Sequence, residues 1–296
     1  MSVIGWMIGG VWAVTGSAVA TVYGLTVKAQ RPKVVPNEQV PPVPYEEVEW
    51  ISGGLPVKGW LLVQPHAAAP GPVVIVAHGW GSNRSRVLRY ALPLYEEGYS
   101  VLMYDARSHG ESGFYKTPTG LLFRDDLLSA IAWLKTRPEI DPARIGVLGH
   151  SLGGYGAVLA LDEGAPIAAL VTDAMPVRLS AMIATELRRR RLPRFPLASL
   201  VPWIMVWRSG ISKAAMRKAN PARILRDNEQ LSKKPVLLVH SRNDGFIPPS
   251  ELEYVVTRVP GVRHLFVDSE GHSASERDPA FWPEVRSFYR EALQKK

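Results

Sequence analysis

The chain has 296 residues, of which 46% are hydrophobic and 21% are charged, and it contains no cysteine. This apolar content excludes an intrinsically disordered chain. The missing cysteines exclude disulfides, thiolate metal sites and a cysteine nucleophile. The length suits one large α/β domain or two smaller domains. The formal net charge is +8.

The first 27 residues carry no charged side chain, and Lys28 is the first residue that does. As a helix, residues 3–27 would be roughly 37 Å long, enough to cross a hydrocarbon core of about 30 Å. We therefore predict a transmembrane anchor over residues 1–27, with a cleaved signal peptide and export as the alternative. Basic residues directly after the span favour a single-pass protein whose body is cytoplasmic.

The rest of the chain divides into a linker and a body. Residues 28–44 contain five prolines, a composition that favours an extended linker. From residue 45 to 296, short apolar runs alternate with helical patterns. This alternation predicts an α/β domain with a mostly parallel central sheet and helices on both faces. Strands are expected at 57–63, 73–77, 101–104, 145–148, 168–171, 236–239 and 264–267, and helices at 85–97, 121–136, 152–162, 250–258 and 279–293.

The strongest chemical signal is the sequence GHSLGG at residues 149–154, between a predicted strand and a predicted helix. Glycines permit a sharp turn there, and the serine hydroxyl would then lie at the positive end of a helix dipole. Ser151 is therefore the candidate nucleophile. The alternative interpretation is a glycine-rich turn in which Ser151 only caps the helix.

A serine hydroxyl needs a base to activate it, and the base needs an acid to orient it. His272 lies in a loop just after a predicted strand and is the candidate base. Asp244 follows the strand at 236–239 and is the candidate acid, because loops at the carboxyl ends of strands form the active site of such folds. The rivals that we consider less favoured are His240 and His264 for the base, and Asp173 and Asp268 for the acid.

Ester or amide cleavage also needs donors for the oxyanion of the tetrahedral intermediate. One candidate is the backbone N–H of Leu152, which follows the candidate nucleophile. The other is the backbone N–H of Trp80, in the sequence HGWG at 78–81 after the strand at 73–77. No substrate-binding residue is predicted.

From about residue 45 onward, the chain resembles serine hydrolases of the α/β-hydrolase fold. The motifs that carry this resemblance are 78–81, the turn DARSHGESG at 105–113, GHSLGG, Asn243-Asp244 and Gly271-His272. The apolar segment before them also resembles the membrane-anchored branch with BEM46-like and ABHD-type members. The resemblance implies hydrolysis of an ester, thioester or amide without a metal or organic cofactor, and a structural role for the 105–113 turn.

Residues 178–234 contain 14 basic and three acidic residues, so this segment supplies the whole positive balance. It follows the sixth strand of the fold, where α/β-hydrolases carry a cap, and we expect a cap insert over residues 176–233. Arg188–Arg191 precede the apolar stretch Leu197–Trp207, a combination that suits an anionic membrane surface. A solvated surface and attraction of acidic substrates are the alternatives, and nucleic-acid binding is not expected.

These features together predict a membrane-anchored serine carboxylesterase that acts on a small-molecule or lipid-like acyl ester. The alternatives are a peptidase or acyl-peptide hydrolase, a thioesterase of the same fold, and an inactive membrane-tethered binding protein. Dehalogenase or epoxide-hydrolase chemistry is not expected, because those relatives have an aspartate where this chain has Ser151.

Overall fold

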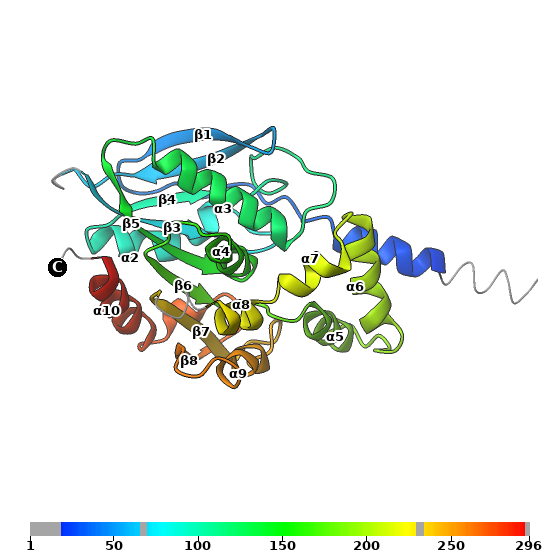
Figure 1. The fold of residues 1–296 in the computed structure, drawn as a ribbon. Helices are drawn as coiled ribbons and strands as arrows, with labels where there is room; N and C mark the ends of the chain where they lie inside the picture. The colour runs from blue at the N-terminus through cyan, green and yellow to red at the C-terminus, as the bar shows by residue number, and fades with distance from the viewer. Residues whose placement is uncertain (1–18, 66–69, 229–233, 294–296) are drawn as a thin grey trace, which may run out of the picture.

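A computed structural model describes residues 19–65, 70–228 and 234–293 of the chain (Figure 1). Its centre is an eight-stranded sheet in the order β1-β2-β4-β3-β5-β6-β7-β8. The strand β2 is antiparallel to β1 and to β4, and all other neighbours are parallel. The strands are β1 (Glu46–Ser52), β2 (Leu55–Leu62), β3 (Gly71–Ala77), β4 (Ser100–Tyr104), β5 (Ile140–His150), β6 (Ala169–Asp173), β7 (Val236–Asn243) and β8 (Arg263–Glu270).

Helices cover both faces of the sheet, so the predicted α/β architecture is confirmed. One buried cluster joins the sheet to α3, α4, α8 and α9, and a second joins the opposite face to α2 and α10. The helices are α2 (Leu88–Glu96), α3 (Gly120–Leu134), α4 (Leu152–Asp162), α5 (Leu179–Arg189), α6 (Leu197–Arg208), α7 (Lys213–Lys218), α8 (Pro221–Asp227), α9 (Ser250–Val256) and α10 (Phe281–Leu293), with short 3₁₀ turns η1 (Ser85–Val87) and η3 (Ser275–Arg277).

The first strand, β1, is absent from the predicted elements. It lies at the edge of the sheet, where Val48, Trp50 and Ser52 are buried and the residues between them are exposed. Three glutamates occupy its exposed positions. The strand therefore lacks the continuous apolar run that indicates the strands buried on both faces.

The segment between β6 and β7, where we expect a cap insert, carries α5 to α8. Its last helix belongs to the body, because Ala222, Ile224 and Leu225 of α8 are buried in the core cluster. On α6, Trp203 and Trp207 are 54% and 64% exposed. Contact of this face with an anionic membrane stays a prediction.

The predicted single-pass membrane localisation is contradicted. Within residues 19–65, 70–228 and 234–293, no helix is both long enough and apolar enough to cross a bilayer. Residues 1–18 of the predicted anchor lie outside the described residues. The end of the anchor belongs to a helix at 19–29, beside α6 (Figure 1), where the Tyr23 hydroxyl accepts a hydrogen bond from Arg208 Nη1 at 2.8 Å. A residue of the predicted anchor thus has a charged partner in the protein.

The proline-rich segment at 28–44 contains no helix beyond residue 29 and no strand, but it is attached to the body. Asn83 Nδ2 donates to the carbonyl oxygens of Val35 and Pro36, both at 2.8 Å. Asn37 Nδ2 donates to Asp105 Oδ2 at 3.0 Å. The segment is therefore packed against the first residues after β3 and β4, rather than acting as a free spacer.

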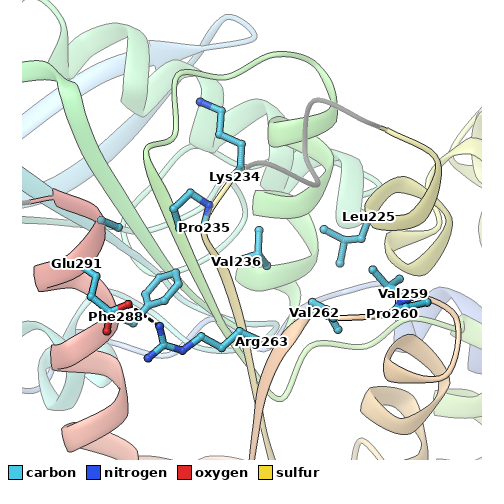
Figure 2. Close-up of a pocket in the computed structure, with 12 residues that line it drawn as sticks. Leu225, Lys234, Pro235, Val236, Val259, Pro260, Val262, Arg263, Phe288 and Glu291 are labelled. Atoms are coloured by element: carbon cyan, nitrogen blue, oxygen red, sulfur yellow. Dashed lines mark hydrogen bonds and ion pairs between the residues drawn. The ribbon is translucent and has the colours of Figure 1, made fainter.

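A cavity of about 320 Å³ lies between β7, β8 and α10. Val236 and Arg263, the first residues of the two strands, contribute to its wall, together with Phe288 and Glu291 of α10 (Figure 2). The cavity is thus at the amino ends of β7 and β8. The candidate catalytic residues follow the carboxyl ends of the strands, at the opposite edge of the sheet.

Candidate active site

The candidate nucleophile Ser151 forms a sharp turn between β5 and α4. Its φ and ψ are 52° and −120°, a conformation that costs a residue with a side chain about 1–3 kcal/mol. The neighbouring glycines make the turn possible: a Cβ at Gly149 would lie 2.4 Å from Gly154 N, and one at Gly153 would lie 2.2 Å from Ala77 O. The serine is therefore held in a strained position at the amino end of α4, with 5% of its surface exposed.

The candidate base and acid meet at the same edge of the sheet. Asp244 follows β7 and His272 follows β8, and His272 Nδ1 lies 2.7 Å from Asp244 Oδ2. The other oxygen of this buried carboxylate, Oδ1, accepts the backbone N–H groups of Phe246 and Ile247 at 2.8 and 2.9 Å. A carboxylate only accepts, so Nδ1 carries the imidazole proton. In neutral His272, Nε2 is consequently free to accept a proton.

The His272 ring lies beside the residue that precedes Ser151. Its centroid is 4.8 Å from that of His150 and 5.1 Å from that of Phe246. Within the described part of the chain, Ser151 Oγ and His272 share no hydrogen bond. Such hydrogen bonds are often long without substrate and shorten when it binds. The chemistry expected of Ser151 therefore requires a local approach of hydroxyl and imidazole.

The rivals for acid and base have other partners. The Asp268 side chain is 79% exposed and lies near Arg242. Asp173 is buried and accepts a hydrogen bond from Tyr90 OH at 2.5 Å. His240 Nε2 bonds with the carbonyl oxygen of Ile247, and His264 Nδ1 pairs with that of Val262. Of the three candidate acids, Asp244 is the one hydrogen-bonded to His272.

The loop after β3 brings the candidate oxyanion donor close to the serine. A Cβ at Gly79 would lie 2.7 Å from Ser151 Cβ and 3.3 Å from Ser151 Oγ. The N–H of Trp80 donates to no other described residue. Leu152 is the first residue of α4, so its N–H is one of the four that have no partner inside the helix. Both candidate donors are thus available to a ligand oxygen.

The His78 ring fixes the peptide between Gly79 and Trp80, called the 79–80 peptide below. His78 Nε2 accepts the backbone N–H of Ala106 at 2.9 Å, so Nδ1 carries the proton and donates to Gly79 O at 2.7 Å. Burial lowers the pKa of His78 to about 4 and keeps the ring neutral. The carbonyl and N–H of a trans peptide point in opposite directions. Holding the Gly79 carbonyl therefore also sets the direction of the Trp80 N–H.

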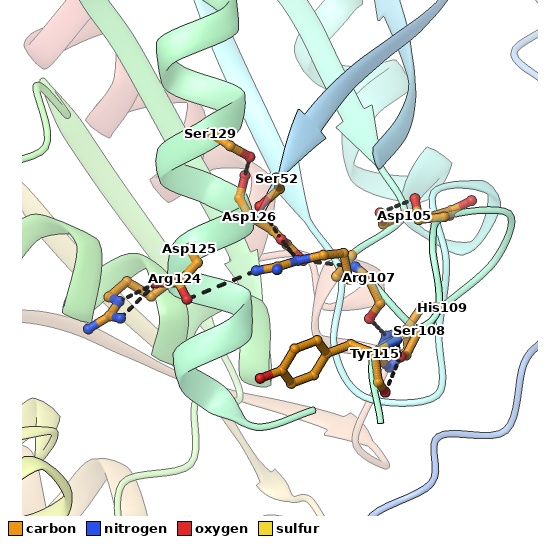
Figure 3. A network of polar contacts seen from close by, with 12 residues as sticks. Ser52, Asp105, Arg107, Ser108, His109, Tyr115, Arg124, Asp125, Asp126 and Ser129 are labelled. Carbon is orange, nitrogen blue, oxygen red and sulfur yellow. Dashed lines mark hydrogen bonds and ion pairs between the residues drawn. The ribbon is translucent and has the colours of Figure 1, made fainter. Parts of the chain in front are cut away.

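The 105–113 turn is held by buried ion pairs (Figure 3). Arg107 pairs with Asp126, whose carboxylate also accepts from Ser52 Oγ at 2.7 Å. Arg84 Nη1 donates to Asp105 at 2.6 Å. These contacts agree with a structural role for the turn. Within residues 19–65, 70–228 and 234–293, no cluster of three or more Asp, Glu, His or Cys side chains is placed to hold a metal ion.

Sequence reasoning missed a second acid–imidazole pair in this region. His150 and Asp173 are directly opposite each other in the pairing of β5 and β6, and His150 Nε2 lies 3.2 Å from Ser273 Oγ. The available signal was a histidine beside the candidate nucleophile and an aspartate at the end of the next strand. The contact with Ser273 spans 123 positions, so no local pattern indicates it.

Known proteins resemble this chain over most of its length. Residues 68–233 match the family model described as serine aminopeptidase, S33, and residues 200–294 match one described as TAP-like protein. The uncharacterized protein YqkD of Bacillus subtilis is 29% identical over 246 residues, which are 81% of this chain and 75% of that protein. The uncharacterized protein Rv2307c of Mycobacterium tuberculosis is 33% identical over 231 residues, 75% of this chain and 70% of that protein.

A solved structure also resembles this fold. The esterase Pf2001 of Pyrococcus furiosus superposes with a TM-score of 0.71 at 26% identity, over 89% of this chain and 97% of that one. The first of the two family matches includes the 78–81 loop, the GHSLGG turn and the segment between β6 and β7. The chain therefore belongs to the family described as serine aminopeptidase, S33, within the α/β-hydrolase superfamily.

Proposed function

We propose that this protein is a serine hydrolase that cleaves carboxylic esters through an acyl-enzyme. The observation that carries the proposal is the meeting of three groups at one sheet edge. Ser151 occupies a strained turn, the Asp244 carboxylate orients His272, and the His272 ring lies against the residue that precedes Ser151.

In this mechanism, Ser151 Oγ attacks the ester carbonyl carbon while His272 Nε2 takes the hydroxyl proton. Asp244 keeps the proton on Nδ1 and stabilises the imidazolium that forms. Its two backbone donors hold the carboxylate in place. His272 then gives the proton to the leaving alcohol, and water activated by the same imidazole releases the acid and frees Ser151.

The negative charge of the tetrahedral intermediate would be held by the N–H groups of Trp80 and Leu152. Both groups lack a competing partner among the described residues, and the first is oriented through His78. Removing one oxyanion donor in a serine hydrolase costs about 10²–10³ in kcat. Correct orientation of the 79–80 peptide would therefore affect the rate rather than the folding.

The substrate class rests on the comparisons as well as on the site. The Pyrococcus furiosus protein is described as an esterase and covers nearly the same length, which favours ester cleavage. The family description as serine aminopeptidase favours a second candidate function, cleavage of a peptide amide at an amino terminus. Both reactions use the same nucleophile and base, so the geometry at Ser151 supports each of them.

Paired substrates with a common readout separate the two candidates. We would measure kcat/KM for p-nitrophenyl esters of increasing acyl length and for p-nitroanilides of amino acids with a free amino group. Ester cleavage is expected to be the faster, and it should be abolished by Ser151→Ala and retained by Ser269→Ala. Preference for the anilides would support the aminopeptidase candidate. Absence of both activities in folded protein would contradict the proposal.

A further inference from the structure

A second acid–imidazole–hydroxyl chain runs beside the proposed catalytic one. It consists of Asp173, His150 and Ser273. His150 Nδ1 lies 3.5 Å from Asp173 Oδ2, and His150 Nε2 lies 3.2 Å from Ser273 Oγ. Asp173 and His150 are buried, with 0% and 4% of their surface exposed, whereas Ser273 is exposed. The chain thus links the interior of the sheet to the loop that carries His272.

The inner end of this chain is firmly held. Asp173 Oδ2 accepts from Tyr90 OH at 2.5 Å, and the backbone carbonyl of Asp173 accepts the N–H of Ser151 at 2.8 Å. Burial opposes the ionisation of Asp173, but His150, Tyr90 and Ser275 beside it hold the pKa of this carboxyl below its ordinary value. The aspartate therefore supports both the turn at the nucleophile and the ring next to it.

The direction of the outer hydrogen bond follows from the imidazole. Burial lowers the pKa of His150 to about 4, so the ring is neutral near pH 7. Its Nδ1 faces a carboxylate, which cannot donate, and so carries the ring proton. Nε2 is then an acceptor, and the Ser273 hydroxyl donates to it. The serine hydroxyl is in this way hydrogen-bonded to a buried ring whose Nδ1 lies 3.5 Å from Asp173 Oδ2.

This hydrogen bond holds the loop on the C-terminal side of His272. On the N-terminal side of His272, the Gly271 N–H donates to the Asn243 carbonyl at 3.3 Å. His272 Nδ1 pairs with Asp244, and the centroid of the His272 ring is 4.8 Å from that of His150 and 5.1 Å from that of Phe246. Without the Ser273 hydroxyl, the residue after His272 loses this hydrogen bond to β5.

We propose that Ser273 and His150 are positioning residues for His272, and that they hold the imidazole where it can take the Ser151 proton. This inference rests on the proposed function. Base position affects proton transfer more than ground-state binding, so kcat should fall while KM stays nearly constant. General bases contribute about 10²–10⁴ to the rate. Loosening one of several supports should cost about tenfold in kcat.

Two serines near the end of β8 give a matched comparison. The Ser273 hydroxyl bonds with His150, whereas the buried Ser269 hydroxyl has no partner among the described residues. In ester hydrolysis by the full chain, Ser273→Ala should lower kcat about tenfold with KM within twofold. Ser273→Thr should restore most of the rate, and Ser269→Ala should match the wild type. Equal kcat for Ser273→Ala and wild type would overturn the inference while leaving the proposed function intact.

A double-mutant cycle tests whether His150 and Ser273 act together. An asparagine can keep an N–H near the position of His150 Nδ1 but cannot reach that of Nε2. If both residues act through one hydrogen bond, the rate losses of His150→Asn and Ser273→Ala should not add in the double variant. Fully additive losses would overturn the inference.

Hydrogen exchange in the peptide covering residues 271–274 provides a measurement that needs no activity. Exchange should be faster in Ser273→Ala than in wild type and unchanged in Ser269→Ala. Wild-type protein without hydrolytic activity would contradict the proposed function. Even then, unchanged exchange in Ser273→Ala would separately overturn the positioning role.

Discussion

Substitution of Gly79 by alanine should disturb the site without unfolding the body. The added Cβ would lie 2.7 Å from Ser151 Cβ and 3.3 Å from Ser151 Oγ and the His150 carbonyl. Carbon atoms in contact are normally about 3.5–4.0 Å apart. The 78–81 loop and Ser151 must therefore separate by about 1 Å.

A displacement of that size has a measurable cost. Misplacing reacting groups by about 1 Å lowers the rate on the order of 100-fold, which corresponds to about 2.7 kcal/mol of transition-state stabilisation. We therefore expect kcat/KM of Gly79→Ala for a p-nitrophenyl ester to fall about 100-fold. The melting temperature should also fall, because Gly79 and Ser151 are both buried, so the rates are compared at a temperature where both proteins are folded.

The matched control is Gly245→Ala. Gly245 lies in the loop after β7, and a Cβ there would have no atom within 4 Å. Its kcat/KM should stay within about twofold of the wild type, since nothing has to move. A Gly79→Ala protein with wild-type kcat/KM would refute the inference that the close approach of the 78–81 loop to Ser151 matters for the reaction.

Three further predictions concern the buried polar groups. His78→Asn keeps a donor near the Nδ1 position and should retain more ester hydrolysis than His78→Gln, which keeps an acceptor near Nε2. The reverse order would show that the hydrogen bond with the Ala106 N–H matters more than the orientation of the 79–80 peptide. Asp126→Ala leaves Arg107 buried without its partner and should lower the free energy of unfolding in urea by about 3–5 kcal/mol, and a loss below 1 kcal/mol would contradict this. The pKa values of His78 and His150 fall from 6.5 to about 4, and that of His109 to about 3. As the pH falls, the unfolded chain therefore takes up protons on these histidines before the folded chain does. The free energy of unfolding should decline between pH 6.5 and pH 4, by on the order of 3 kcal/mol for each ring. Urea midpoints that stay constant from pH 7 to 5 would exclude this pH dependence.

The parts of the fold that local chemistry dictates were predictable. Strand segments buried on both faces, such as β3 and residues 145–148 of β5, have continuous apolar runs, and the Ser151 turn requires the glycines around it. Asp244 and His272 could be paired because parallel strands end at the same edge. The edge strand β1 was missed because its glutamates interrupt the apolar pattern.

Contacts between distant segments were not predictable. Hydropathy over residues 1–27 measures how apolar the side chains are, but it does not show that Tyr23 meets Arg208. The single-pass membrane localisation was predicted wrongly, because no helix of the described residues is long and apolar enough to cross a bilayer. The predicted cap insert included α8, although this helix is buried in the same core cluster as α4. Its burial depends on packing between distant segments, which a local sequence pattern does not indicate. Membership of the BEM46-like branch stays a prediction.

The second acid–imidazole pair shows the same limit at the site itself. Asp173 was considered as the acid for His272, since it follows an apolar strand. Its side chain instead faces His150 and Tyr90. The choice between two carboxylates at neighbouring strand ends depends on how β6, β7 and their loops pack, which no single segment of the sequence encodes.

The most direct test of the account is to identify the residue that reacts with a fluorophosphonate. Wild-type protein treated with the probe should gain one adduct, which peptide mass spectrometry should locate on Ser151. The adduct should be lost in Ser151→Ala and should form more slowly in His272→Ala. No adduct on folded wild-type protein, or an adduct on another serine that persists in Ser151→Ala, would contradict the proposed nucleophile.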